Sequence, residues 1–350
     1  MPTVPRPPIR RGEPRFLVWR NGKLGNTIVA IPLILALRRA FPHCHLAVVV
    51  DRLGRDLLSA YAEIDDLIVY ERRHGREALT ESVRLVRRLS ADRFSHSLHL
   101  KRFFRNAFLA RLAGIPNRFG FDTGGRAPLL TKTVPYREDR NMVLTCLSLL
   151  SLLGQSEQGV EPYQYPARDA DMAIAAGLLA GCGAADRPYA FIHCGATTQA
   201  SHRLTAGAIK ALYAVIARQL SLVPILMMGP GDESMVAEAR VAFGRDEPAV
   251  CDFRPHSVRV TIEAMRRARL FVGHDSGPAH LAALAGTPEI VFYVNRSDMA
   301  MHLAKWKPWQ EQCATCVVSE APAEDLVLGA FARAVETLRL GTAEPQSNPP

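Results

Sequence analysis

Short apolar runs alternate with helical periodicities along almost the whole chain, and this alternation limits the fold more than any other feature. Runs such as Phe16–Arg20, Leu46–Val50 and Tyr189–His193 have the length and composition of buried strands. Between the runs, segments such as Glu77–Leu89 and Ala206–Leu220 repeat apolar residues at helical spacing. Strands that alternate with helices form a mainly parallel sheet covered by helices on both faces. We therefore predict an α/β protein.

The alternation pauses once, near the middle of the chain. A Leu-rich helical segment, Asn141–Leu153, ends at Gly154 and is followed by a proline-containing connector, Glu161–Arg168. A chain of 350 residues suits two domains. We predict an N-terminal α/β domain over 15–165, a linker over 166–187, a C-terminal α/β domain over 188–322 and a closing helix over 323–341. Residues 1–14, rich in Pro and Arg, and the tail 342–350 are expected to be disordered.

Cysteine usage and the lack of long apolar runs indicate a cytoplasmic protein. No run approaches the ~20 apolar residues of a membrane span, and the first residues have no apolar signal core. Seven scattered cysteines do not form a disulfide framework. Cys313 and Cys316 form one C-x-x-C pair without the second pair that a four-ligand zinc site needs, so we favour a structural pair or two free thiols over a metal or redox role.

The formal net charge is +9, with much of the excess between Arg72 and Arg140. Nucleic acid, an anionic membrane surface or anionic small molecules would each suit it. Nucleic acid ranks last because no zinc-finger spacing, RNA-recognition motif or basic zipper accompanies the charge. The cluster Arg102–Arg105 allows peripheral contact with the cytoplasmic membrane, but we favour a solvated face with two core aromatics.

Ligands of open parallel sheets bind beyond the carboxyl ends of the strands, so function is expected in the loops that follow Arg20, His193, Met228 and Gly273. The first loop, RNGKLGN, has two glycines that allow close approach of a substrate, and Asn26 is expected to cap the following helix. The second, HCGATTQASHR, offers hydroxyls and basic side chains that suit phosphate. The third, GPGDE, is either a capped turn or a carboxylate for a ribose.

The fourth loop, GHDSGPAH, is the most informative, since four functional residue types meet at a strand-to-helix junction. Free N–H groups and the positive end of the helix dipole attract a diphosphate. His280 lies one turn beyond Ser276 and can face the same site. A hydrolase is disfavoured because the spacing is not G-x-S-x-G. A metal site at His274, Asp275 and His280 is disfavoured because adjacent side chains diverge.

The four loop sequences, in this order, resemble the motifs of glycosyltransferase family 9, the ADP-heptose:lipopolysaccharide heptosyltransferases. The matching segments are RNGKLGNTIVAIPLILALRRAFP, HCGATTQASHRLT, GPGDE and, most specifically, GHDSGPAHLAALAGTP. The resemblance spans Phe16 to Leu340. It implies a GT-B fold, with two Rossmann-like domains whose parallel sheets face a central cleft. It also implies that the acceptor binds mainly to the first domain and the donor to the second.

The same resemblance implies a reaction. A sugar, such as a heptose, would pass with inversion from a nucleotide-diphosphate sugar to an anionic glycan or lipid-linked acceptor, without metal or cofactor. The positions that match the family's diphosphate site are Thr197, Thr198, Ser276, Gly277 and His280. Asp275 matches the catalytic acidic position near the donor sugar, and Asp232 matches a carboxylate near the nucleoside. Lys23 and Gly25 belong to the acceptor-side loop.

Two departures from the family pattern affect the chemistry. The first motif normally ends in Gly-Asp, with the Asp as general base, but here that catalytic position is Asn26. An amide cannot take a proton from a hydroxyl at neutral pH. In the donor loop the usual Lys is His202, so that the donor-binding charge is expected either on Arg203 or on His202 when that histidine is protonated. The substitution at Asn26 leaves open an alternative, a non-catalytic nucleotide-sugar-binding protein.

Overall fold

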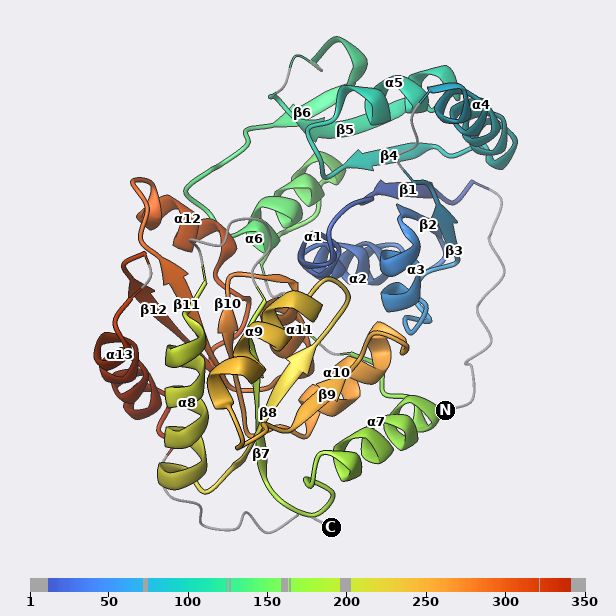
Figure 1. The fold of residues 1–350 in the computed structure, drawn as a ribbon. Coiled ribbons are helices and arrows are strands. Elements are labelled where there is room, and N and C mark those ends of the chain that lie inside the picture. Colours follow the sequence, from blue (N-terminus) through green and yellow to red (C-terminus); the bar gives the residue numbers. More distant parts are fainter. Residues whose placement is uncertain are drawn as a thin grey trace. The chain divides into compact units, whose positions relative to one another are not determined.

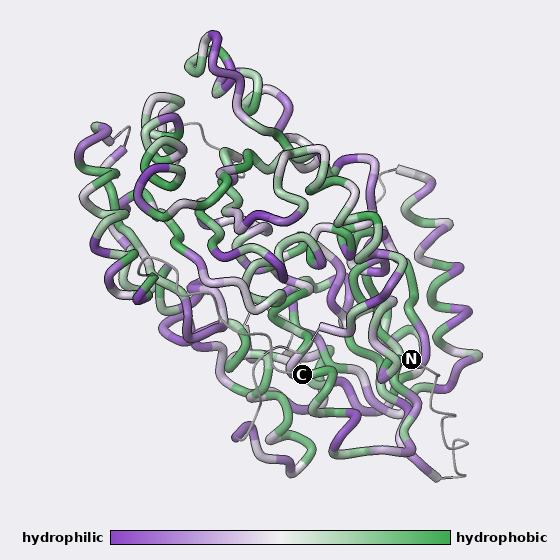
Figure 2. Tube along the Cα trace, turned by 90° about the horizontal axis from the view of Figure 1, so that it is seen from below, coloured by the Kyte–Doolittle hydropathy of each residue, from purple (hydrophilic) through white to green (hydrophobic). Residues whose placement is uncertain are grey.

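The computed structural model describes residues 12–71, 75–123, 125, 127–158, 163, 165–195, 203–320 and 322–340. They form two compact units, residues 1–162 and 163–350. Each unit contains a six-stranded parallel sheet with helices packed against it (Figure 1). Along the helices, hydrophobic and hydrophilic residues alternate (Figure 2). The predicted α/β class is confirmed for both units.

The sheet of the first unit has the order β3-β2-β1-β4-β5-β6. Its strands are β1 (Arg15–Trp19), β2 (His45–Val50), β3 (Asp66–Val69), β4 (His96–His99), β5 (Asn117–Phe121) and β6 (Lys132–Val134). Its helices are α1 (Leu24–Ile28), α2 (Ile31–Ala40), α3 (Arg52–Leu58), α4 (Gly75–Asp92), α5 (Phe104–Leu112) and α6 (Met142–Leu147), with 3₁₀ turns η1 (Ala127–Leu129) and η2 (Ser148–Leu153).

The sheet of the second unit has the order β12-β11-β10-β7-β8-β9. Its strands are β7 (Tyr189–His193), β8 (Val223–Met228), β9 (Val250–Asp252), β10 (Leu270–His274), β11 (Glu289–Val294) and β12 (Cys313–Val318). Its helices are α7 (Asp169–Gly181), α8 (Ala206–Gln219), α9 (Glu233–Phe243), α10 (Val258–Arg266), α11 (Gly277–Ala285), α12 (Met299–Trp306) and α13 (Glu324–Thr337).

In both sheets the strand order reverses once along the chain, and ligands of open parallel sheets bind at such a reversal point. In the first unit the chain adds β2 and β3 on one side of β1, then returns to place β4 on the other side. In the second unit β8 and β9 lie on one side of β7, and β10 lies on the other. The loops that leave the two central strands therefore diverge, which leaves a crevice at the carboxyl ends of β1 and β4, and of β7 and β10.

Burial of the central strands explains the apolar runs. All of Phe16–Trp19 is fully buried, as is nearly all of Leu46–Val50. A parallel sheet covered on both faces needs apolar side chains on both faces of its strands, so these runs do not alternate with polar residues. The elements that were not predicted are short or contain charged and polar residues, as in the strand NRFGF of β5.

The predicted cap at Asn26 is wrong. The helix begins at Leu24 with Lys23 as N-cap residue, and it breaks after Ile28 before α2 begins. Asn26 lies inside α1, where its backbone carbonyl and its side-chain oxygen both accept hydrogen bonds from Arg20; the Nη2–Oδ1 distance is 2.9 Å. The buried guanidinium of Arg20 thus holds the loop, so Asn26 does not cap the helix.

Two further local predictions concern the middle of the chain, the Leu-rich helical segment and the linker after it. The segment Asn141–Leu153 forms α6 and then the 3₁₀ turn η2, which Gly154 ends in the left-handed conformation. Residues 169–181 of the predicted linker form α7, and Arg259 of α10 binds Asp171 of α7 at 2.9 Å.

The cysteines of the C-x-x-C pair lie on the last strand of the second unit. Cys313 and Cys316 are free buried thiols of β12, and burial raises the pKa of both. This agrees with the prediction of free thiols. Among the described helices, none is long and apolar enough to cross a bilayer.

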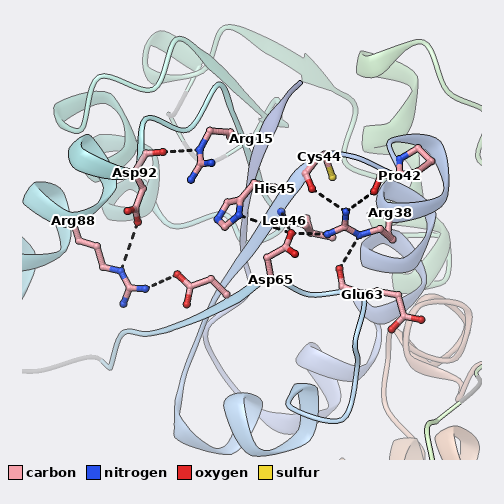
Figure 3. A network of polar contacts seen from close by, with 11 residues as sticks. Arg15, Arg38, Pro42, Cys44, His45, Leu46, Glu63, Asp65, Arg88 and Asp92 are labelled. Carbon is pink, nitrogen blue, oxygen red and sulfur yellow. Dashed lines mark hydrogen bonds and ion pairs between the residues drawn. The ribbon is translucent and has the colours of Figure 1, made fainter. Parts of the chain in front are cut away.

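A polar network at the amino ends of the first unit's strands is structural (Figure 3). The Arg38 guanidinium donates to the carbonyls of Pro42, Cys44 and Glu63 and to the Asp65 carboxylate at 2.6 Å. The same carboxylate accepts a hydrogen bond from the backbone amide of Leu46 at 2.7 Å. Because ligands of such sheets bind at the carboxyl ends, this network stabilises α2 against β2 and lies away from the expected site.

Candidate functional site

The start of α11 has the features of an anion site in the second unit. It follows β10 directly at the crevice beside β7. Ser276 occupies the N-cap position with extended backbone, yet its side chain makes no capping hydrogen bond, and Pro278 lies in the first turn. Within the described residues, the first N–H groups of α11 therefore have no side-chain cap. They remain available for phosphate oxygens at the positive end of the helix dipole.

The Ser276 side chain contacts a buried histidine, His193, which in turn contacts a buried aspartate, Asp232. Its Oγ lies 3.4 Å from Nδ1 of His193 and 3.1 Å from the carbonyl oxygen of His274. The other ring nitrogen of His193, Nε2, lies 3.2 Å from Oδ2 of Asp232, which also accepts a hydrogen bond from the amide of Gly229 at 2.8 Å. The three side chains come from the ends of β7, β8 and β10, so the fold brings together segments that are far apart in sequence.

The contact with Asp232 favours the tautomer of His193 that carries its proton on Nε2, which leaves Nδ1 to accept from the Ser276 hydroxyl. We did not predict His193 as a site residue. The available signal was its place at the carboxyl end of a buried strand, directly before Cys-Gly. Asp232 serves here as a support for His193, which differs from the expected contact with the nucleoside. The nearby Glu233 carboxylate lies 3.3 Å from Arg254.

Gly195 packs directly on this network. A Cβ added to Gly195 would lie 2.2 Å from Oδ1 of Asp232 and 2.8 Å from Nε2 of His193. Real Cβ atoms do not approach other atoms so closely, so any side chain here would displace the pair. The glycine of the second loop is therefore required by packing.

The two histidines of the fourth loop are buried and neutral. Burial lowers the pKa of His274 to about 3, and its Nε2 accepts a hydrogen bond from the amide of Leu204 at 2.7 Å. This bond ties the end of the second loop to β10. Burial also lowers the pKa of His280, whose ring packs edge-on against Trp306 of α12, with centroids 6.4 Å apart. His280 thus connects α11 to α12.

Asp275 is a partly exposed acidic group at the start of α11. Its carboxylate is 31% exposed and lies 2.6 Å from Nε2 of His302 on α12. The other nitrogen of His302 lies 3.3 Å from Nη1 of Arg296. The sequence did not reveal His302, because α12 was not predicted. The histidine holds one oxygen of Asp275, and the partial exposure leaves the carboxylate accessible to a ligand.

Five further residues were predicted to bind the donor, and the structure describes two of them, Arg203 and Gly277. Arg203 lies 3.3 Å from Glu238 and is 26% exposed. Thr197, Thr198 and His202 lie outside the described residues. Gly277 is the first residue of α11, and its role in letting a ligand approach the helix stays a prediction.

The hydrolase interpretation that paired Ser276 with Asp275 gains no support from the geometry, and neither does the metal interpretation, although Ser276, His193 and Asp232 do form a Ser–His–Asp chain. Ser276 contacts the ring of His193, whereas the ring of His274 accepts from Leu204 and Asp275 pairs with His302. In the part of the chain that the structure describes, no three His, Cys, Asp or Glu side chains are arranged to hold a metal ion.

The first unit carries the residues that were predicted to face the acceptor at the carboxyl ends of β1 and β4. Lys23 is exposed at the start of α1, Gly25 is buried, and Asn26 is half-buried against Arg20. Gly22 donates its amide to Asp51 at 3.2 Å. The loop is thus held by two side chains, Arg20 at the end of β1 and Asp51 at the end of β2.

Comparison with known proteins agrees with these features. The family model for glycosyltransferase family 9 (heptosyltransferase) matches residues 82–329. Lipopolysaccharide heptosyltransferase 3 of Escherichia coli is 24% identical over 298 residues, which cover 81% of this chain and 83% of the relative.

Solved structures share the fold over almost the full length. A family 9 glycosyltransferase of Veillonella parvula superposes with a TM-score of 0.81 at 20% identity, covering 93% of this chain and 97% of that one. An E. coli heptosyltransferase solved with ADP-2-deoxy-2-fluoro heptose has a TM-score of 0.68 at 19% identity, covering 92% and 99%. The predicted GT-B class is confirmed, and the chain belongs to glycosyltransferase family 9, a family of sugar-transferring enzymes.

Proposed function

We propose that this glycosyltransferase transfers a heptose or similar sugar, with inversion and without a metal, from a nucleotide-diphosphate sugar to an anionic glycan. The observation that carries the proposal is the uncapped start of α11, with Ser276 supported by His193 and Asp232 and with Asp275 beside it. A relative named lipopolysaccharide heptosyltransferase and a structure solved with an ADP-heptose analogue support this donor class.

Each group has a role in the proposed reaction. The diphosphate accepts hydrogen bonds from the Ser276 hydroxyl and from the N–H groups of Gly277 and its successors, while the helix dipole offsets its charge. Negative charge grows on the leaving diphosphate as its bond to the anomeric carbon breaks, and Arg203 adds a positive charge nearby. The Asp275 carboxylate faces the sugar, where positive charge develops at the anomeric centre. No cofactor is required.

A donor screen tests the proposal. A nucleotide sugar at about 100 times its Kd should stabilise the protein by about 2.7 kcal/mol, which a thermal-unfolding assay detects. ADP-heptose is expected to give the shift, and transfer to a lipopolysaccharide-core acceptor should proceed for many turnovers per site in EDTA. Sugar transfer that stops in EDTA and returns with a divalent cation would contradict the metal-free mechanism. The absence of any shift with nucleotide sugars would contradict the donor assignment.

We further propose that α5 contacts an anionic membrane that carries the acceptor. The cluster Arg102–Arg105 was expected either to contact a membrane or to be a solvated face whose two aromatics lie in the core. The aromatics are not in the core, because the apolar residues Phe103, Phe104, Phe108 and Leu112 are 42–55% accessible. The rings of Phe104 and Phe108 stack at 6.1 Å, and Arg111 lies on the same helix. Apolar rings beside cations suit the interface of an anionic bilayer.

Replacing both Phe104 and Phe108 with Glu should weaken binding to phosphatidylglycerol vesicles by at least about tenfold. The variant loses the two rings that would be buried in the bilayer and gains two negative charges, which the anionic lipid repels. Vesicle sedimentation measures this. Val241→Glu is the control, since Val241 is an isolated exposed apolar residue of the second unit. Equal vesicle binding by the double variant and the wild type would exclude α5 as the contact.

A further inference from the structure

One lysine lies against the acceptor-side loop of the first unit. Lys101 follows β4, whose last residue, His99, pairs with Trp19 of β1. Its Nζ lies 1.8 Å from the position that a Cβ on Gly22 would occupy. Gly22 has φ +144°, which other residues rarely adopt, so the glycine serves both the turn and the close approach of Lys101. The ammonium group is thus placed over the loop that leads to Asn26.

The surroundings of Lys101 disfavour its charged form. Burial lowers the pKa of Lys101 to about 8, and the positive charges of Arg20 and Lys23 act in the same direction, while Asp51 opposes them. The Phe103 ring lies 5.0 Å from Nζ. A lysine with this pKa is partly deprotonated near neutral pH, and its neutral amine can accept a proton.

The other polar groups near this crevice are engaged differently. The Asn26 amide is neutral and binds Arg20. Asp51 caps α3, since its two oxygens accept hydrogen bonds from the amides of Gly54 and Gly22. His99 is fully buried, stacks on Trp19 and lies 3.0 Å from the Ser97 hydroxyl. Among the described residues beside this loop, Lys101 combines a position over Gly22 with a pKa lowered to about 8.

We propose that Lys101 is the general base of sugar transfer, in place of the carboxylate that Asn26 lacks. This inference rests on the proposed function. The Lys101 amine takes the proton of the acceptor hydroxyl and becomes an ammonium. The acceptor oxygen forms a bond to the anomeric carbon, and the bond between that carbon and the donor's phosphate oxygen breaks. The leaving nucleoside diphosphate keeps the electron pair, so that atoms and charges balance.

The test combines variants with a pH profile of transfer. Lys101→Met should lower kcat by about 10²–10⁴-fold, the usual contribution of a general base, while donor binding in a thermal-shift assay stays unchanged. Lys101→Arg should be equally impaired, because a guanidinium keeps the positive charge but cannot accept a proton. In the wild type, kcat/KM should rise tenfold per pH unit below about pH 8 and then level off.

A rescue separates the base from a merely structural role. Asn26→Asp in the Lys101→Met background should restore part of the transfer and move the rising limb to lower pH, since a carboxylate is ionised there. Lys132→Met, at an exposed lysine of β6, is the matched control and should keep wild-type rates. Wild-type rates in Lys101→Arg, or an unchanged pH limb in Lys101→Met, would overturn the assignment while leaving the donor site intact. Failure of wild-type protein to bind any nucleotide sugar would overturn the proposed function as well.

Discussion

Replacing Asp275 with Ala is expected to lower kcat for sugar transfer by about 10²–10³-fold, which is typical when one charged group aimed at the transition state is removed. Asp275 is a partly exposed carboxylate at the start of α11, and His302 holds one of its oxygens at 2.6 Å. In the proposed reaction, a fixed negative charge there would stabilise the positive charge that develops on the donor sugar. Donor affinity should change less than kcat, because that charge is absent from the ground state. Steady-state kinetics with a donor-binding measurement separate the two.

Two matched variants define what the Asp275 result means. Asp275→Asn keeps the shape but removes the charge, so it should be nearly as slow as Asp275→Ala. Asp298→Ala removes an exposed carboxylate that pairs with Arg296 beside α12, and it should be close to wild type. Combining Asp275→Ala with His280→Ala should lose at least as much activity. If the double variant kept wild-type kinetics, α11 would not be the donor site.

Replacing Gly195 with Ala should damage the same site without touching a ligand directly. The new methyl group would have to displace either Asp232 or His193, whose atoms lie 2.2 and 2.8 Å from its position. Overpacking and a lost buried hydrogen bond each cost 1–3 kcal/mol, so we expect a loss of about 3 kcal/mol of unfolding free energy. Because Ser276 loses its support, donor binding should weaken by about 100-fold, equivalent to about 2.7 kcal/mol. Denaturant unfolding and calorimetry measure the two effects.

Gly177→Ala provides a control of opposite sign. Gly177 lies exposed inside α7 with no atom within 4 Å of its Cβ position, so alanine should stabilise the protein by about 0.5–1 kcal/mol. Donor binding should stay unchanged. If Gly195→Ala behaved like Gly177→Ala in both assays, the buried network would have no role in holding Ser276.

Local patterns in the sequence identified the two α/β units and the position of the donor loop. Buried parallel strands such as Tyr189–His193 need apolar residues at every position, and this pattern is visible without any tertiary information. The loop GHDSGPAH was identifiable for a similar reason: a polar strand end, a glycine and a proline at a helix start are local requirements. The resemblance to family 9 then gave the loops a common function.

The roles of individual side chains depended on long-range packing. His193 and Ser276 are 83 residues apart, and only the adjacency of β7 and β10 brings them within 3.4 Å. His302 was missed because α12, which carries it, was not predicted. Asn26 was mistaken for a cap because its partner, Arg20, is recognised only when the loop folds back on the end of β1.

The sequence by itself therefore determined the fold class and the family, and it singled out the loop proposed to bind the donor, because each depends on residues close together in the chain. The tertiary structure alone decided that His193 contacts both Ser276 and Asp232, that Asp275 contacts His302, and that Lys101 lies over Gly22 of the loop that leads to Asn26. These contacts join the ends of different parallel strands. Sequence periodicity carries no information about which strand ends become neighbours, since that order is set by how the whole sheet packs.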